Sequence, residues 1–178
     1  MLDRSFDDHL RSDCANGQLV GLKSGCPVLV RYDGDDDDSP ERVYRTEFGR
    51  VASAHGTDMS PEHERRRPLG VVVSITKKEG APFPEQIGLG RAANTDVSLP
   101  LTKLSKYHAF FREDGSRGFV VADAGSKNGT WVDGARLAAK APAPVVDGTR
   151  IRVGPYKFFF YTWPGFLRLL DQRAADTA

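Results

Sequence analysis

The chain has 178 residues, of which 39% are hydrophobic and 28% are charged, and its formal net charge is +1. These values are ordinary for a globular protein and provide no overall field that would attract nucleic acid or an anionic membrane. No apolar run approaches the roughly 20 residues that span a bilayer, and the acidic start of the chain does not resemble a signal peptide. We therefore expect a cytoplasmic protein with no nucleic-acid or membrane partner, in which Cys14 and Cys26 are reduced thiols.

The sequence changes character near residue 69, and residues 1–68 are predicted to form a mixed extension. A short helix from Phe6 toward Cys14 and one buried strand at 27–32 are expected there. Five aspartates crowd positions 33–38, and because like charges repel, they indicate a solvated acidic loop rather than a cation site. The composition of residues 49–68 is typical of a linker.

From residue 69 to residue 178, short β-branched and aromatic runs alternate with turn signals. Strands are predicted at 71–76, 86–90, 97–99, 107–112, 119–123, 130–132, 135–137, 150–154 and 156–161. Asp133-Gly134 indicates a tight hairpin turn between two of these strands. A helix is predicted at 165–175, with Phe166, Leu169 and Leu170 on its packing face. The pattern indicates an all-β sandwich followed by a C-terminal helix.

Three polar clusters stand at strand edges within this segment: Gly90-Arg91, Ser105–His108 and Ser126–Thr130. They would place a guanidinium, hydroxyls, amines and an amide on loops at one end of the sandwich. A phosphorylated side chain carries nearly two negative charges and three acceptor oxygens, and charge-assisted bonds from arginine are strong. The clusters therefore indicate a site that grips a phosphate group on a peptide.

The order Gly-Arg, Ser-x-x-His, Asn-Gly-Thr, together with the block Asp123–Gly134, resembles the forkhead-associated (FHA) domain family. The resemblance covers about residues 69–162. It implies a β-sandwich of about eleven short strands that binds phosphothreonine-containing proteins or peptides through loops at one end. Such modules commonly work beside Ser/Thr kinases, so a kinase or its substrate is the expected partner.

By this resemblance, the expected phosphopeptide-binding residues are Arg91, Ser105, Lys106, Lys127 and Asn128. Arg91 would be the primary phosphate ligand, because its guanidinium offers a planar fork of donors. Asn128 would hold the main chain of the ligand in an extended form. Lys127 stands where the family often has threonine, and Lys106 replaces the frequent Arg or Asn. Both lysines keep a cationic donor beside the phosphate.

Other residues of the motifs are expected to shape the loops: Gly90, His108, Gly129 and Thr130. Lys103 is predicted to favour an acidic residue three positions after the phosphothreonine, because loop residues near this place select that side chain in the family.

Two other classes of function compete with this hypothesis. One is a phospho-independent scaffold or adaptor that uses the sandwich face or the extension to bind a protein. The other is an enzyme, but His9, Cys14, His55 and His63 form no catalytic motif, and no nucleophile accompanies His108. We therefore expect no catalytic residue, no cofactor and no metal.

Overall fold

The computed structural model describes residues 18–20, 22–32, 69–116 and 118–177. The predicted N-terminal helix, the acidic positions 33–38 and the linker at 49–68 lie outside these residues. No helix within these ranges is long and apolar enough to cross a membrane.

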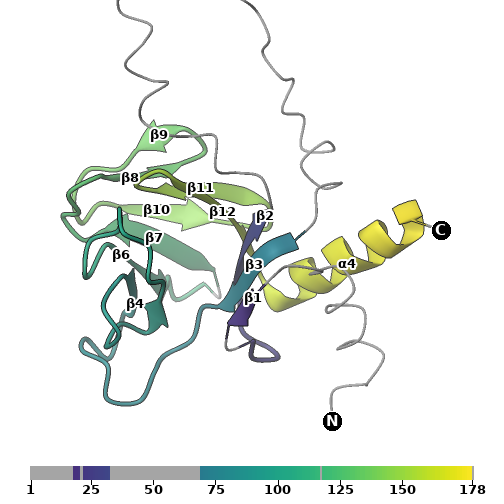
Figure 1. Cartoon of the computed structure of the whole chain (residues 1–178), viewed down its shortest axis with the longest axis horizontal. Helices are drawn as coiled ribbons and strands as arrows, with labels where there is room; N and C mark the ends of the chain where they lie inside the picture. The colour runs from purple at the N-terminus through teal and green to yellow at the C-terminus, as the bar shows by residue number, and fades with distance from the viewer. Residues whose placement is uncertain (1–17, 21, 33–68, 117, 178) are drawn as a thin grey trace, which may run out of the picture.

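Two β-sheets pack face to face, with one helix beside them (Figure 1). One sheet has seven strands in the order β1-β3-β2-β12-β11-β8-β9, and the other has five in the order β10-β7-β6-β4-β5. The predicted all-β sandwich is thus confirmed. In chain order the elements are β1 Gln18–Val20, β2 Val28–Tyr32, β3 Leu69–Ser74, β4 Ile87–Gly90, β5 Val97–Ser98, β6 Ala109–Glu113, β7 Phe119–Asp123, β8 Thr130–Val132, β9 Ala135–Arg136, β10 Pro142–Val145, β11 Thr149–Val153, β12 Tyr156–Tyr161 and α4 Trp163–Thr177.

The main core lies between the sheets, and the alternation of side chains along each strand builds it. In β11, Ile151 and Val153 are buried between the sheets, whereas Arg150 and Arg152 are only partly buried. This is the period of two that a pleated strand imposes. The same core contains side chains from both sheets, including Leu29, Val73, Phe158 and Phe160 from one and Leu89, Phe111 and Val121 from the other.

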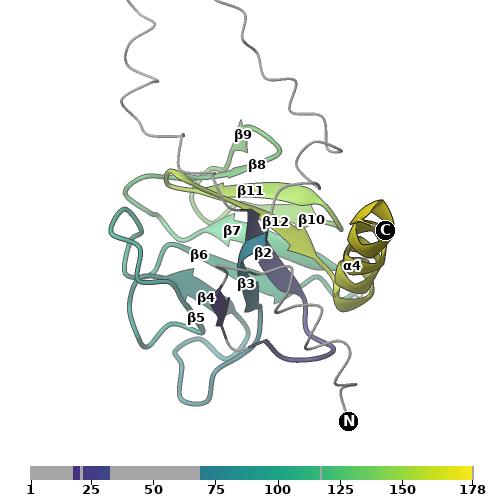
Figure 2. The ribbon, with the colours of Figure 1, turned by 45° about the vertical axis from the view of Figure 1, so that its right-hand side comes forward.

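A second core lies between α4 and the outer face of the seven-stranded sheet (Figure 2). Phe166, Leu169 and Leu170 form the predicted packing face and contact residues of β2, β3 and β12. The helix starts at Trp163 because Thr162 caps it, its Oγ1 accepting the N–H of Gly165 at 3.2 Å. The outer face is therefore closed by a helix on the side of β2 and β3.

The strand predicted at 27–32 is confirmed, but it is an interior strand of the sandwich. β2 pairs with β3 on one side and with β12 on the other, and Val28 and Val30 are fully buried. β2 is the strand that joins β3 to β12 in the sheet. The sandwich therefore includes residues on both sides of residue 69. Two strands were not predicted, β1 and β10.

Candidate functional site

Two of the three polar clusters lie on loops that run side by side. The N–H of Arg91 donates to the carbonyl of Ser105 at 2.9 Å, and the N–H of Ala92 donates to the carbonyl of Lys106 at 3.1 Å. Gly90 is required for this approach, because a Cβ built there would lie 2.2 Å from the Lys106 carbonyl oxygen. The loop after β4 and the loop before β6 thus bring Arg91, Ser105 and Lys106 together.

The third cluster, on the loop between β7 and β8, joins the second one. The backbone N–H of Lys127 donates to Ser105 Oγ at 3.1 Å, and Asn128 Nδ2 donates to the carbonyl of Lys103 at 2.7 Å. Ser105 Oγ serves as the acceptor in the first bond, so its own hydroxyl hydrogen can still be donated to another group. The five predicted binding residues therefore share one end of the sandwich.

His108 is fully buried beneath these loops and connects two of them. Its Nδ1 accepts the N–H of Ser105 at 3.1 Å, which leaves the ring hydrogen on Nε2, and Nε2 donates to the carbonyl of Gly129 at 2.9 Å. Burial lowers the pKa of His108. The hydrogen bond to the Gly129 carbonyl and the charge of Asp123 raise this pKa, but by less. The ring is therefore neutral, with both nitrogens occupied, so it shapes the loops and is not placed to act as a base.

Asp123, at the end of β7, organises the third loop. Its carboxylate accepts the N–H groups of Gly125 and Ser126, both at 2.8 Å, and the hydroxyls of Ser126 at 2.7 Å and Thr130 at 2.6 Å. Burial alone would raise the pKa of Asp123, but the hydrogen bonds from Thr130, Ser126 and Gly125 bring it below its ordinary value. An ionised carboxylate thus holds the turn that presents Lys127 and Asn128. Sequence reasoning did not assign this role to Asp123, although an Asp two residues before a Gly is a turn signal.

Asp96 is a second structural carboxylate that the sequence did not reveal. Its side chain is 1% exposed and pairs with Lys77 Nζ at 3.0 Å. It also accepts the N–H groups of Lys78 at 2.8 Å and Gly88 at 2.7 Å. These bonds fix the end of the loop that begins at Arg91.

The predicted ligand side chains stand on this framework with their charges toward solvent. Arg91, Lys106 and Lys127 are exposed. Arg91 Nε donates to the carbonyl of Leu104 at 3.1 Å, which orients the guanidinium and leaves its two terminal nitrogens for a ligand. The structure thus places three exposed cations on adjacent loops at one end of the sandwich. Within the described ranges, no group of three or more His, Cys, Asp or Glu side chains is arranged to hold a metal ion.

Comparison with known proteins identifies relatives of this architecture. The family model of the FHA domain matches residues 87–154. The glycogen accumulation regulator GarA of Mycolicibacterium smegmatis is 33% identical over 131 residues, which cover 68% of this chain and 80% of that protein. An oxoglutarate dehydrogenase inhibitor of Corynebacterium jeikeium is 29% identical over 109 residues, which cover 58% of this chain and 73% of that protein.

Among solved structures, an FHA domain studied for phosphothreonine-dependent interactions is 20% identical with a TM-score of 0.45, covering 76% of this chain and 96% of that one. The FhaA FHA domain, complexed with an intracellular domain, is 22% identical with a TM-score of 0.43, covering 75% and 98%. The family-model match and the similarity to GarA show that this chain belongs to the FHA domain family, a family of phosphothreonine-dependent interaction modules.

Proposed function

We propose that the loops carrying Arg91, Ser105, Lys106, Lys127 and Asn128 bind a phosphothreonine peptide, and that this binding serves Ser/Thr kinase signalling. The observation that carries the proposal is the set of cross-linked loops, which hold three exposed cations around a serine hydroxyl. A phosphate dianion needs both positive charge and several donors, and this end of the sandwich supplies both.

Arg91 and Ser105 are the central phosphate ligands in this proposal. The Leu104 carbonyl holds Nε of Arg91, so the terminal nitrogens can meet two phosphate oxygens without reorganisation of the side chain. The Ser105 hydroxyl can donate its hydrogen to a third phosphate oxygen while its Oγ still accepts the Lys127 N–H. The two ligands thus approach the phosphate from adjacent loops.

Lys106 and Lys127 complete the charge of the pocket. The backbone N–H of Lys127 already donates to Ser105, so Lys127 would reach the phosphate through its ammonium group. An ammonium acts as a mobile point charge rather than a fixed fork, and therefore adds affinity with less geometric selectivity.

Asn128 would bind the main chain of the peptide. One amide hydrogen of its Nδ2 is committed to the Lys103 carbonyl, which leaves the second hydrogen and the Oδ1 acceptor for a peptide group. A donor and an acceptor on one planar amide match an extended backbone. Lys103, whose carbonyl receives that bond, is exposed and would favour an acidic residue three positions after the phosphothreonine.

We further propose a non-catalytic regulatory protein of the cytoplasm. The relatives support this, since their names describe a regulator and an inhibitor. The phosphothreonine partner would be a kinase or a protein that a kinase modifies.

The test compares binding of a phosphothreonine peptide library, and of its unphosphorylated counterpart, to the natural chain and to Arg91→Ala. We expect a loss on the order of 100-fold in Arg91→Ala, because bonds to a charged group contribute about 1.5–3 kcal/mol each. Arg112→Ala is the matched control, since Arg112 is exposed on β6 and should leave binding unchanged. Equal binding of phosphorylated and unphosphorylated peptides would contradict the proposal and favour a phospho-independent scaffold.

A further inference from the structure

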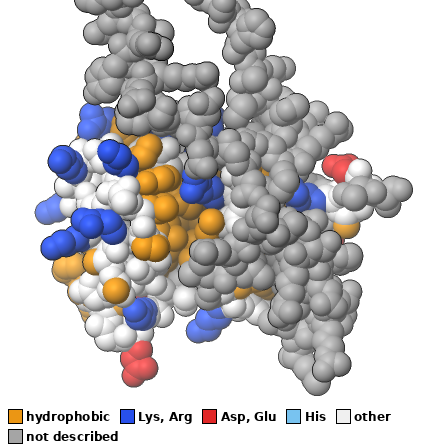
Figure 3. Space-filling view, in the orientation of Figure 1, with side chains coloured by type: hydrophobic (Ala, Val, Ile, Leu, Met, Phe, Trp, Pro, Cys, Tyr) orange, Lys and Arg blue, Asp and Glu red, His pale blue; other side chains and the backbone are white. Residues whose placement is uncertain are grey.

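An exposed aromatic side chain stands on the loop between β3 and β4. Among the described residues, the large apolar side chains that are exposed are Phe83, by 56%, and Val146, by 68%. Phe83 has a φ of +61° and precedes Pro84, and a bulky residue rarely adopts this left-handed conformation, least of all before a proline. Such strain persists only where the surroundings enforce it, and it gathers at functional sites. In the space-filling view, hydrophobic side chains reach the surface beside Lys and Arg side chains (Figure 3).

Lys77 enforces the conformation of this loop. Its Nζ donates to the carbonyls of Pro82 at 2.9 Å, Phe83 at 3.0 Å and Gln86 at 2.9 Å. The same ammonium pairs with Asp96 at 3.0 Å, and Asp96 fixes the end of the first of the three polar loops. The loop of Phe83 and a loop that carries a proposed phosphate ligand therefore share one anchor.

Tyr107 connects Phe83 with the proposed binding residues. The two ring centroids lie 5.5 Å apart, with the ring planes at 59°. Tyr107 directly follows Lys106, and its hydroxyl donates to Oε1 of Gln86 at 3.2 Å. A Cβ built on Gly88 would collide with the Tyr107 ring, so this ring lies against β4. Phe83 and Tyr107, which we call the aromatic pair, are therefore held in place beside a proposed phosphate ligand.

Strand β4 sets the distance between the aromatic pair and the phosphate. Ile87 and Leu89 pack in the main core, so Gly88 and Gly90 both lie on the outer face of the strand. Tyr107 lies over Gly88, and the first two polar loops approach each other at Gly90. Two residues of a strand span about 7 Å, and an extended peptide rises about 3.3 Å per residue. The aromatic pair is therefore about two to four peptide residues away from a bound phosphothreonine.

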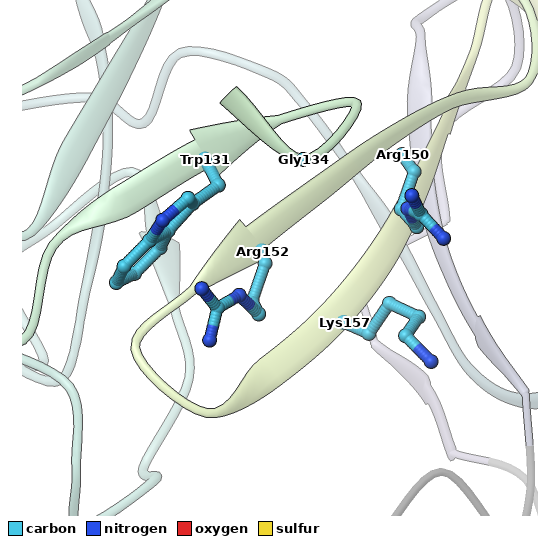
Figure 4. A pocket seen from close by; sticks show the side chains of 5 residues that line it. All are labelled: Trp131, Gly134, Arg150, Arg152 and Lys157. Carbon is cyan, nitrogen blue, oxygen red and sulfur yellow. The ribbon is translucent and has the colours of Figure 1, made fainter. Parts of the chain in front are cut away.

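Trp131 is a surface aromatic side chain of a different kind. On the outer face of β8, β9 and β11, which we call the basic face, Arg152 Cζ lies 3.6 Å from the centroid of the Trp131 ring and Arg136 Cζ lies 5.4 Å from it. Figure 4 shows Arg152 beside Trp131. Guanidinium groups already contact that ring, whereas more than half of the Phe83 side chain is open to solvent. The aromatic pair is therefore the better place for an apolar side chain of a ligand.

We propose that the aromatic pair binds an apolar side chain of the phosphopeptide, two or four residues before the phosphothreonine. The inference rests on the proposed function, in which Ser105 meets the phosphate and Lys103 meets a residue after it. Lys103, Ser105 and Tyr107 follow one another along the chain before β6, so the residues before the phosphothreonine run toward Tyr107. Side chains of an extended peptide alternate, so those two and four residues away point to the same side as the phosphothreonine.

The experiment measures binding of phosphothreonine peptides that share one core. Leucine or asparagine stands two or four residues before the phosphothreonine and, in a second set, two or four residues after it. We expect leucine before the phosphothreonine to improve affinity on the order of fivefold over asparagine, because half burial of a leucine gains about half of its transfer free energy. The gain should persist at physiological salt, since salt screens charges and not apolar contacts. No gain before the phosphothreonine, a gain only after it, or a gain that salt removes would overturn the proposal.

Variants of Phe83 locate the gain. Phe83→Asn removes the ring and suits the positive φ, because asparagine tolerates the left-handed conformation. This variant should lose the gain from leucine and keep the affinity for the asparagine peptide, whereas Phe83→Tyr keeps a ring and should keep the gain. If Phe83→Asn keeps the full gain, the aromatic pair is not the binding surface. If it also loses the affinity for the asparagine peptide, Phe83 supports the loops rather than the ligand, and the proposal fails.

Val146→Asn is the matched control, since it also replaces an exposed apolar side chain. Val146 follows β10, where Val145 pairs with Phe119 at the start of β7, whereas the third polar loop leaves the other end of β7. The control should therefore keep both the gain from leucine and the affinity for the asparagine peptide. An equal loss of the gain in Val146→Asn and Phe83→Asn would contradict the assignment to the aromatic pair.

Ring currents report the contact directly. The methyl protons of the peptide leucine should shift upfield in the NMR spectrum of the complex with the natural chain, because they lie against two aromatic rings. The shift should shrink in the complex with Phe83→Asn, which has one of the two rings. A leucine whose methyl shifts are the same free and bound would contradict the proposal.

A second copy of the chain is the competing occupant of the aromatic pair. If the natural chain dimerises without peptide in sedimentation and Phe83→Asn does not, the occupant is another copy and the proposal is overturned. The same state in both chains supports the peptide. Dependence on phosphorylation is scored with the asparagine peptide and its unphosphorylated form. Its loss would refute the proposed function and this inference together, whereas a missing gain from leucine alone leaves the proposed function intact.

Discussion

The loop end and the basic face both present cations, but they are built in different ways. At the loop end, the cations stand on loops that buried His108 and Asp123 tie together by hydrogen bonds. On the basic face, the outer face of β8, β9 and β11, the guanidinium groups of Arg136 and Arg152 rest against the ring of Trp131. The first arrangement fixes donors in place, as the recognition of one phosphate requires. The second holds guanidinium groups against an aromatic ring on regular strands, where stacking stabilises them.

This difference makes the two regions separable by mutation. Disturbing the buried network should affect phosphopeptide binding and stability together, because the same bonds carry both. Substituting Arg136 on the basic face should change neither stability nor recognition of the phosphate, since Arg136 is exposed and substitutions of exposed residues away from such networks usually have small effects.

The largest expected effect is that of His108→Ala. The substitution leaves a cavity in a fully buried place and removes the partners of the Ser105 N–H and the Gly129 carbonyl. Each buried group left unpaired costs about 1–3 kcal/mol, so we expect a loss of roughly 3–4 kcal/mol in the free energy of unfolding. Urea denaturation measures it, and a loss well under 1 kcal/mol would contradict the bracing role.

The pH dependence of stability gives a second view of His108. Burial lowers its pKa in the folded state below the ordinary 6.5, so the unfolded chain takes up the proton first as pH falls. The stability gained because the folded state holds a neutral ring is complete above about pH 6.5. It declines below that pH, toward the folded-state pKa of His108. In His108→Gln the decline between about pH 7.5 and pH 5 should be smaller than in the natural chain. An equal decline in both chains would show that the ring is not the titrating group.

Gly90→Ala is expected to have the next largest effect. A Cβ at this position would collide with the Lys106 carbonyl, and backbone cannot move aside as the end of a side chain can. Overpacking of this kind typically costs about 1–3 kcal/mol. Because the collision would push the loops of Arg91 and Ser105 apart, affinity for the phosphopeptide should fall as well. Gly115→Ala is the control: its φ of +81° strains alanine, but no atom lies within 4 Å of the added Cβ, so binding should be unchanged.

Asp123→Asn should have a comparable effect on stability and a clear effect on the third loop. An amide cannot accept from the four donors that the carboxylate now satisfies, so we expect a loss of about 1–3 kcal/mol. The folded-state pKa of Asp123 lies below its ordinary 3.8, so its contribution is present above about pH 3.8 and is lost as pH falls through the lowered value. The variant should therefore lose part of the acid sensitivity that the natural chain shows below that pH. Unfolding measured across this range tests it, and unchanged acid sensitivity would contradict the assignment.

The strands were predictable because local signals mark them. The predicted bounds of β7, β8 and β12 agree with the structure, and the Asp133-Gly134 turn has the positive φ values that a tight hairpin needs. β10 escaped prediction because Pro142 and Pro144 cannot donate to a ladder, which is tolerated here at the edge of a sheet.

The network behind the site was less predictable, because its bonds join distant positions. Asp96 pairs with Lys77, 19 residues earlier, and nothing in either local sequence indicates the other. The basic face assembles only when β8, β11 and β12 are placed side by side in register, which brings Trp131 opposite Arg152 and Arg152 opposite Lys157. The alternation Arg150-Ile151-Arg152 is typical of a strand with one polar face, but it contains no signal that Trp131 lies beside that face.

The smallest predicted effect is also the one that best separates the two regions. Lys127→Ala removes an exposed ammonium from the phosphate loops and keeps the backbone N–H that donates to Ser105. We expect affinity for the phosphopeptide to fall about two- to fivefold, since an exposed charge pair contributes up to about 1 kcal/mol, and stability to stay within about 0.5 kcal/mol.

The affinity lost in Lys127→Ala should depend on the salt concentration. The contribution of Lys127 should be screened by salt, whereas the contribution of the Arg91 fork should persist, because bidentate bonds depend on geometry as well as charge. Titration calorimetry of Lys127→Ala at low and physiological salt measures this. A loss that does not change with salt would mean that Lys127 holds the phosphate by a fixed hydrogen bond, which would place it with Arg91 rather than with the diffuse cations of the basic face.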